Sequence, residues 1–362
     1  MHPRDGQKSR VSGLCMGLLA WAISASAVAQ DIYRLDPETD EWKLEQTPAP
    51  NSSAAQLARA RVLLTEGRHD RALNMANRWM ARNPGSPLMP EAYLIKGDAL
   101  VGLGDEYESL YEFEYLVRKF PGSEVFSLAL LREYDIAMKY AHGLKRKMFG
   151  LRIIDATDEA EELFIRIQER MPGSNLAEKS GLELADLYFR QRKMELAASA
   201  YAIFIERYPR STEIPFARRR LIYSNIASFK GPEFDIVGLL EAKAELQQLA
   251  VQRPAEAERI GAQALVERIN ESEANKLLVT AQWYLHQGDP IACEFTIRSL
   301  VRKFPSSAAA MKALRIVPQV LRQLPQAVLD RTPNYAQMSK EVLERKPPQP
   351  EPVSDGSTED QP

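Results

Sequence analysis

The chain has 362 residues, of which 45% are hydrophobic and 27% are charged, and its formal net charge is −2. These values are ordinary for a folded globular protein, and they exclude a chain that is disordered throughout, a collagen-like chain and a multi-pass membrane protein. The near-zero charge also argues against a dedicated nucleic-acid-binding protein, which is normally strongly basic.

Residues 1–29 have the pattern of a secretory signal peptide. Three basic residues precede the apolar stretch 11–23, and Ala27-Val28-Ala29 supplies the small residues of a cleavage site before Gln30. We therefore expect export to a bacterial periplasm or a similar compartment, with a retained signal anchor as the alternative reading.

The next segment, residues 30–52, has no helical period and contains three prolines. Proline lacks the backbone N–H that a helix interior requires, so we expect an extended N-terminal arm here.

A short phrase made of a bulky residue, a proline, a variable residue and a serine returns along the chain. It occurs at Pro84, Pro121, Pro172, Pro209 and Pro305, with a degenerate copy at Pro254. A basic residue precedes each full phrase, where the helix dipole favours a cation, and the proline then stops the helix. We expect the serine to cap the next helix, so each phrase marks the junction between two helices.

The spacing around these prolines fits the 34-residue tetratricopeptide repeat. When Pro209 is set at position 32, the small residues Ala185 and Ala197 and the bulky residues Tyr201 and Phe204 fall where this repeat requires them. The units that end at Pro84, Pro121 and Pro305 show the same pattern. No strand pattern of comparable strength appears. We therefore predict an all-α, tetratricopeptide-like α-solenoid of about six helical hairpins over residues 53–325.

Three features modify this simple array. The first helix of the last unit is expected to be long, from about 255 to 286. We predict a C-terminal helical extension over residues 326–345. Residues 346–362 contain five prolines and four acids, so this segment is predicted to be a disordered tail.

Residues 142–158 form an insertion between the two helices of one unit. It contains Lys145, Arg146 and Lys147, followed by apolar residues that include Phe149 and Leu151. We interpret this segment as a docking patch for a partner or as a contact with anionic head groups. The alternative is that its apolar residues pack back on the solenoid.

A second candidate surface is the concave face, which the first helix of each hairpin lines in a solenoid. Its predicted partner-binding residues are Arg61, Asp98, Asp186, Phe189, Arg190, Gln282 and His286. Such a polar and aromatic lining suits an extended peptide or a partner helix, and the alternative is an ordinary solvated surface.

The sequence contains no phosphate-binding loop, nucleophile elbow or zinc-protease motif. Its four histidines lie too far apart for a local metal motif, and we expect Cys293 to be a buried packing thiol. We predict no cofactor, no metal and no enzyme activity; the remaining alternative is an enzyme that uses the insertion as a lid.

The repeat phrases resemble the BamD-like family of outer-membrane assembly lipoproteins. The resemblance covers roughly residues 53–320 and is carried by three segments, 182–211, 231–235 and 281–307. It implies a periplasmic scaffold that docks to the barrel-assembly machinery and helps β-barrel precursors insert into the outer membrane. A general cell-envelope adaptor in cell-wall synthesis or division is the alternative.

The sequence departs from this family at its presumed lipid-attachment signal. Leu14, rather than a small residue, precedes Cys15, and most of the apolar core follows that cysteine. We therefore expect membrane association to be indirect, through protein partners.

Overall fold

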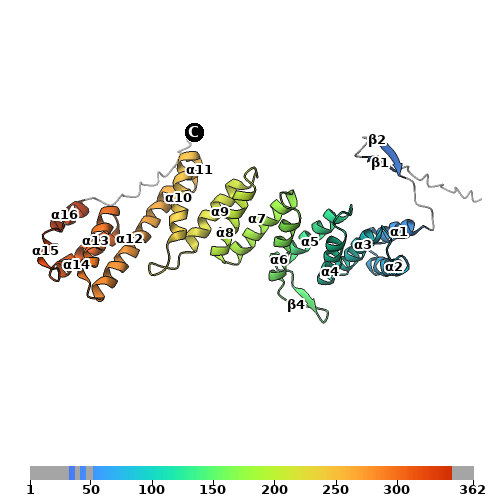
Figure 1. Cartoon of the computed structure of the whole chain (residues 1–362), viewed down its shortest axis with the longest axis horizontal. Coiled ribbons are helices and arrows are strands. Elements are labelled where there is room, and N and C mark those ends of the chain that lie inside the picture. The colour runs from blue at the N-terminus through green and yellow to red at the C-terminus, as the bar shows by residue number, and fades with distance from the viewer. Residues whose placement is uncertain (1–31, 37–40, 46–51, 345–362) are drawn as a thin grey trace, which may run out of the picture.

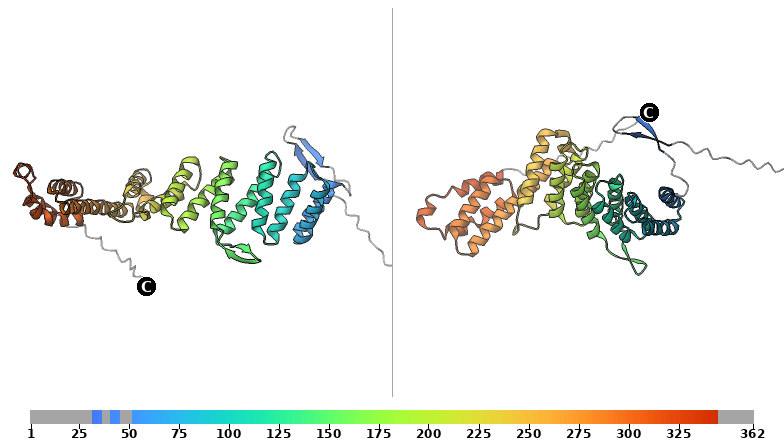
Figure 2. Two further views of the ribbon diagram at one scale, coloured as in Figure 1. Left: turned by 60° about the horizontal axis from the view of Figure 1, so that its bottom comes forward. Right: turned by 45° about the vertical axis from the view of Figure 1, so that its right-hand side comes forward.

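The computed structural model describes residues 32–36, 41–45 and 52–344. Within these ranges the chain is a row of helical hairpins stacked side by side into an elongated body, with α1 at one end and α16 at the other (Figures 1 and 2). The prediction of an all-α, tetratricopeptide-like solenoid is confirmed.

Six helical hairpins follow one another within the described residues. They are α1 (Ser53–Thr65) with α2 (His69–Arg82), α3 (Met89–Gly102) with α4 (Glu106–Lys119), α5 (Phe126–Ala141) with α6 (Thr157–Arg170), α7 (Asn175–Arg190) with α8 (Met194–Arg207), α9 (Ile214–Ala227) with α10 (Val237–Gln252), and α12 (Ala262–His286) with α13 (Pro290–Lys303). The short α11 (Pro254–Arg259) lies between the last two, and α14 (Ala308–Leu321), α15 (Gln326–Leu329) and α16 (Tyr335–Glu344) complete the stack.

The proline phrases form the junctions between hairpins, as predicted. Each residue before the proline ends a helix with φ between −142° and −123° and ψ between 52° and 69°; these residues are Asn83, Phe120, Met171, Tyr208, Arg253 and Phe304. This geometry follows from the steric clash between a proline ring and a helical residue before it. The junctions are therefore fixed by local chemistry alone.

The prediction that the serine of each phrase caps the next helix is only partly correct. Ser174 and Ser307 accept hydrogen bonds from the N–H groups of Ala177 and Ala310 and are true N-caps. After the other three full phrases the helix starts later, at Met89, Phe126 and Ile214. There the chain makes an additional turn first, which the local pattern did not reveal.

The predicted long helix over 255–286 is interrupted. Gly261, with φ +66°, separates α11 from α12. This left-handed conformation carries little steric cost at glycine, and it ends α11 before the chain starts a new helix.

Small residues allow the helices of one hairpin to approach closely. Ala60, Ala72, Ala185, Ala197 and Cys293 occupy the predicted small positions and have no exposed surface. Large side chains such as Phe113, Tyr201 and Phe204 fill the layer between them. Cys293 is fully buried in this layer, as expected, and burial raises the pKa of its thiol to about 11.

A buried ion cluster holds three helices together near the C-terminal end. Glu273 of α12 is 3% exposed and accepts hydrogen bonds from Lys243 of α10 (2.7 Å) and Lys303 of α13 (2.9 Å). Burial acts to raise the pKa of Glu273, but the two lysines outweigh it and lower the pKa.

Replacement of Glu273 by glutamine is expected to destabilise the protein at neutral pH by roughly 1–3 kcal/mol, because both lysines lose their counter-charge. Since the folded-state pKa is lowered, the stabilisation is present above the ordinary pKa and is lost as the pH falls through the folded value. Thermal melts of both proteins from pH 7 to pH 3 should therefore converge in acid. A constant difference in melting temperature would contradict the assignment.

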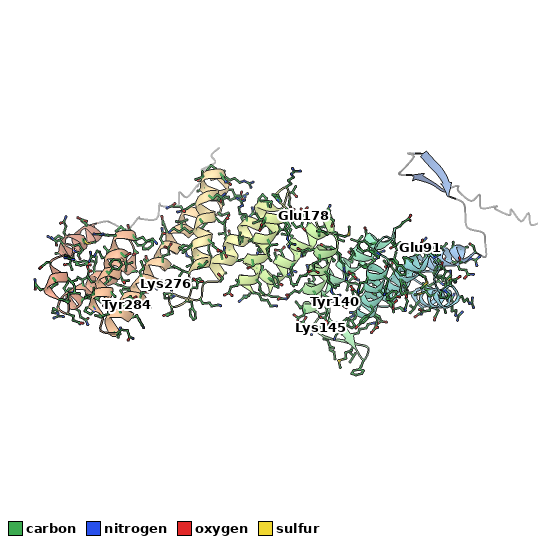
Figure 3. The ribbon with its side chains drawn as sticks, viewed as in Figure 1. Glu91, Tyr140, Lys145, Glu178, Lys276 and Tyr284 are labelled. Atoms are coloured by element: carbon green, nitrogen blue, oxygen red, sulfur yellow. The ribbon has the colours of Figure 1, made fainter. Side chains whose placement is uncertain are left out.

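The other insertion of the solenoid, residues 229–235, lies between α9 and α10. Lys276 lies on α12 (Figure 3). Its ammonium group donates hydrogen bonds to the carbonyl oxygens of Pro232 (3.3 Å) and Phe234 (2.6 Å). This segment is therefore anchored to the next hairpin.

The described part of the N-terminal arm consists of two extended pieces. β1 (Ile32–Asp36) pairs antiparallel with β2 (Glu41–Glu45). The predicted signal peptide, Cys15 and the predicted tail at 346–362 lie outside the described residues.

Candidate partner-binding site

The insertion between α5 and α6 is a β-hairpin, a structure that was not predicted from the sequence. β3 (Arg146–Met148) pairs antiparallel with β4 (Leu151–Ile154) across the two-residue turn Phe149-Gly150. Both turn residues have positive φ, 50° at Phe149 and 81° at Gly150, as a type I′ hairpin turn requires.

Three basic side chains fasten this hairpin to the solenoid. The Lys147 ammonium lies 2.8 Å from Asp105 Oδ1, and an Nη of Arg152 lies 2.8 Å from Glu106 Oε2 at the start of α4. Arg146 lies 2.8 Å from Glu159 of α6 and covers the ring of Tyr107 at 4.1 Å. A register shift between Arg146 and Lys147 lets these consecutive residues both point inward.

The alternation of the strands directs apolar side chains to the solvent. Phe149 is 93% exposed, Leu151 65%, Ile153 56% and Met148 41%. The alternative reading, that these side chains pack back on the solenoid, is therefore wrong. The interpretation of this segment as a contact with anionic head groups also loses support. Arg146 and Lys147 are paired with acidic residues of the chain, so only Lys145 of the three is an exposed base (Figure 3).

Phe149 combines full exposure with an unfavourable backbone conformation. A bulky residue at positive φ costs roughly 1–3 kcal/mol, and here its ring gains no burial in return. The two-residue turn imposes this conformation, and residues with such strain are found more often at functional sites. This combination makes the hairpin a candidate contact surface.

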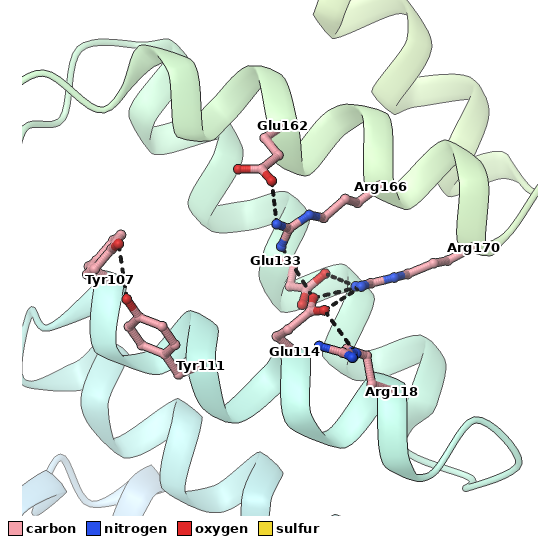
Figure 4. Close-up of polar contacts among 8 residues, drawn as sticks. All are labelled: Tyr107, Tyr111, Glu114, Arg118, Glu133, Glu162, Arg166 and Arg170. Atoms are coloured by element: carbon pink, nitrogen blue, oxygen red, sulfur yellow. Dashed lines mark hydrogen bonds and ion pairs between the residues drawn. The ribbon is translucent and has the colours of Figure 1, made fainter.

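A groove between α4 and α6 adjoins the hairpin. Its volume is about 350 Å³, and its walls include Tyr107 and Tyr111 of α4 and Glu162 and Arg166 of α6. The hydroxyls of the two tyrosines are 3.1 Å apart, and their rings meet edge to face (Figure 4). Since Arg146 covers Tyr107, the hairpin and the groove form one continuous surface.

The polar end of the groove is a network of arginines and carboxylates. Arg170 donates to both carboxylate oxygens of Glu114 at 2.7 Å and lies 3.4 Å from Glu133 Oε2 (Figure 4). Arg166 lies 3.4 Å from Glu114 and also bonds Glu162 (Figure 4). Such a fixed, nearly charge-balanced lining can orient polar groups of a bound peptide.

Glu133 lies at the floor of this groove and is 1% exposed. Burial raises the pKa of Glu133 to about 8, although Arg170 acts in the opposite direction. Its Oε1 atom has no hydrogen-bond partner among the described residues. The groove thus ends on a buried carboxyl group with unused hydrogen-bonding capacity.

The free energy of unfolding should depend on the protonation of Glu133. Because its folded-state pKa is raised, the native chain holds a proton from the ordinary pKa up to about pH 8, and stability falls as the pH rises through this window. Glu133→Gln removes this titration, so the variant should gain roughly 4 kcal/mol relative to the native chain between pH 5 and pH 9. Urea titrations at both pH values check this. The control is Glu162→Gln, on the exposed rim of the same groove, whose free energy of unfolding should change between the two pH values as it does in the native chain. The same change with pH in all three proteins would contradict the assignment.

The residues predicted to line the concave face lie on first helices, but several are used inside the fold. Arg61 of α1 pairs with Glu91 of α3, Asp98 of α3 lies 2.7 Å from Arg132 of α5, and the Arg220 guanidinium of α9 covers Phe189 of α7 at 4.2 Å. These contacts link successive hairpins. The remaining members are placed as follows: Asp186 accepts a hydrogen bond from Tyr201, and Arg190, Gln282 and His286 are exposed.

The groove residues were not predicted from the sequence, although one signal was present. The buried face of α5 is the apolar series Ala129, Leu130, Ile136, Ala137 and Tyr140, and Glu133 interrupts it. A carboxyl group in the middle of an apolar helix face requires a partner or a function. The arginines that meet it come from α6, too far along the chain for a local pattern to reveal.

No group of three or more His, Cys, Asp or Glu side chains in the described ranges is placed to hold a metal ion. None of the helices described is both long and apolar enough to cross a bilayer.

The fold and this surface define a helical-repeat scaffold for protein–protein interactions. Residues 154–333 match the family model YfiO, described as an outer membrane lipoprotein. The predicted resemblance to the BamD-like family is confirmed for this part of the chain, and the match points to the cell envelope. The comparison with curated proteins returned no match.

Solved structures with a similar helical-repeat fold are distant in sequence. They include the C-terminal part of a TPR repeat-containing protein from Cytophaga hutchinsonii, with 14% identity, a TM-score of 0.36, and coverage of 73% of this chain and 88% of that one. PilW, described as a widely conserved type IV pilus biogenesis factor, has 13% identity and a TM-score of 0.29 over 74% of this chain and 100% of its own. The TPR domain of P58(IPK) has 14% identity and a TM-score of 0.26 over 81% and 83% of the two chains.

Proposed function

We propose that this protein is a periplasmic helical-repeat scaffold that binds protein partners in the assembly of outer-membrane β-barrel proteins. The family match over residues 154–333 supports the envelope setting and the class of partner. Residues 1–29 support export, because they have the pattern of a signal peptide. The protein reaches the membrane through its partners and acts by binding, without catalysis or a cofactor.

The contact we propose is the β3–β4 hairpin together with the adjoining groove. Four exposed apolar side chains on a two-stranded support form the kind of apolar centre that dominates binding energy in protein interfaces. The network around Glu114 and Arg170 supplies a polar border. Phe149, strained and 93% exposed, is the observation that carries this proposal.

The exposed residues Arg190, Gln282 and His286 form a second proposed surface on the first helices. Because the other predicted concave-face residues are engaged in contacts within or between hairpins, this surface is expected to contribute less to binding.

Co-purification with the full-length chain from a detergent extract of envelope membranes tests the proposed function. The expected result is recovery of the barrel-assembly protein in near-stoichiometric amount. Recovery of cell-wall or division enzymes alone would overturn the role in barrel assembly and favour a general envelope adaptor.

A further inference from the structure

A cleft between α1 and α2 carries an unusual concentration of positive charge. It has a volume of about 620 Å³ and is lined by five arginines: Arg59, Arg68, Arg71, Arg78 and Arg82. None of its lining residues, all of them within the described range, is acidic. Residues 52–82 contain six arginines and two acids, a net charge of +4 in a chain whose overall charge is −2.

Of the arginines on α2, only Arg82 lies in the last turn, where the helix dipole favours a cation. Arg71, Arg78 and Arg82 are spaced by seven and four residues, so they share one helix face, where like charges repel. Their guanidinium groups form no ion pair with any residue that the structure describes, whereas Arg68 bonds Glu66. Guanidinium groups recognise carboxylates through paired hydrogen bonds, so the cleft suits an acidic ligand.

The chain carries an acidic segment of matching charge directly before α1. Residues 31–45 contain six acids and two bases, a net charge of −4. Residues 46–51 join this segment to α1, and six residues span at most about 20 Å. Such a short tether keeps the local concentration of the segment near the cleft at about the millimolar level.

Figure 1 places β1 and β2 at the same end of the molecule as α1 and α2. The other acidic segment, residues 346–362, follows α16, which lies at the opposite end (Figure 1). Proximity therefore favours the N-terminal segment as the occupant.

The strand pair and the cleft also complement each other in apolar character. The register pairs Tyr33 with Leu44 and Leu35 with Trp42, so four apolar residues occupy paired positions of the two strands. A two-stranded pair is marginally stable by itself in water and needs a surface to pack on. Between its arginines the cleft offers Leu63 and Met75.

We propose that the acidic strand pair 32–45 binds in the arginine cleft and caps the N-terminal end of the solenoid. Terminal repeats of a solenoid require such covering, because no neighbouring repeat packs on them. In this arrangement the carboxylates of the arm neutralise the arginines, and its apolar residues cover the centre of the cleft.

Hydrogen–deuterium exchange of the full chain tests this proposal. At low salt the amides of 32–36 and 41–45 should be protected, and Arg71→Glu/Arg78→Glu should speed their exchange at least tenfold while the amides of α3 stay unchanged. The control Arg210→Glu/Arg322→Glu changes the net charge equally at two exposed positions elsewhere. It should leave the arm protected.

Charge reversal in the arm gives a second readout. Asp36→Lys/Glu41→Lys, combined with the two cleft substitutions, should restore protection of the strand pair. The proposal is overturned if exchange of the strand pair is equal in the native chain and the cleft variant, or if the control variant exposes the arm to the same extent.

Discussion

Gly97→Ala should destabilise the chain by about 2 kcal/mol, although the same change within a helix normally stabilises by about 1 kcal/mol. A Cβ atom at this position would lie 2.3 Å from Cε1 and 2.6 Å from Cζ of Phe113. Phe113 has no exposed surface, so its ring cannot move aside without displacing the packed layer around it. Gly97 is therefore a point of close approach between α3 and α4. Denaturant unfolding followed by helical circular dichroism measures the loss.

Two variants show whether the Phe113 ring is responsible. In the background of Phe113→Leu, the substitution at Gly97 should cost less than about 1 kcal/mol, because a smaller side chain leaves room for the new methyl group. Gly181→Ala in α7 is the matched control, since its Cβ would meet the flexible end of Gln168 at 3.1 Å. It should be neutral or stabilising. Equal effects at Gly97 and Gly181 would show that helix propensity rather than packing governs this position.

The second large effect is expected on partner binding. Phe149→Asn combined with Leu151→Ser should weaken binding of the partner at least tenfold, since central apolar residues of an interface are typically worth about 2 kcal/mol or more each. The fold should tolerate both changes because these side chains are 93% and 65% exposed. Asparagine also adopts positive φ more readily than phenylalanine, so the hairpin turn itself should be stabilised. Isothermal titration calorimetry with the purified partner measures the affinity.

The control for this experiment is Phe295→Ser with Val251→Ser. These side chains are 68% and 84% exposed and lie outside the hairpin, so the loss of exposed apolar surface is comparable. The control should bind the partner with native affinity. Equal weakening by both double variants, or loss of helical signal in the hairpin variant, would remove the hairpin as a specific contact.

The junctions of the solenoid could be predicted because their causes are local. A proline restricts the residue before it, and small residues in a fixed register permit close helix contacts, so Pro209, Ala185 and Ala197 were sufficient to place one hairpin. The exact helix starts were not predictable in the same way. They depend on how each new helix meets the previous hairpin, which decides whether Ser174 caps a helix directly or Ser86 begins a further turn.

The candidate site was only half predictable for a related reason. The insertion was recognised by its composition, but its strand pairing depends on a Phe149-Gly150 turn, and Asn-Gly is the usual signal for such a turn. The inward direction of Lys147 and Arg152 depends on Asp105 and Glu106, more than 40 residues earlier in the chain. Contacts at that distance follow from the stacking of hairpins and not from any local pattern.

Site-specific photo-cross-linking in living cells tests the central claim most directly. A benzophenone side chain placed at position 149 should form a covalent adduct with the barrel-assembly protein, whereas the same group at the similarly exposed position 251 should not. Absence of any adduct specific to position 149, or the same adducts from both positions, would contradict the view that this hairpin presents the scaffold to its partner.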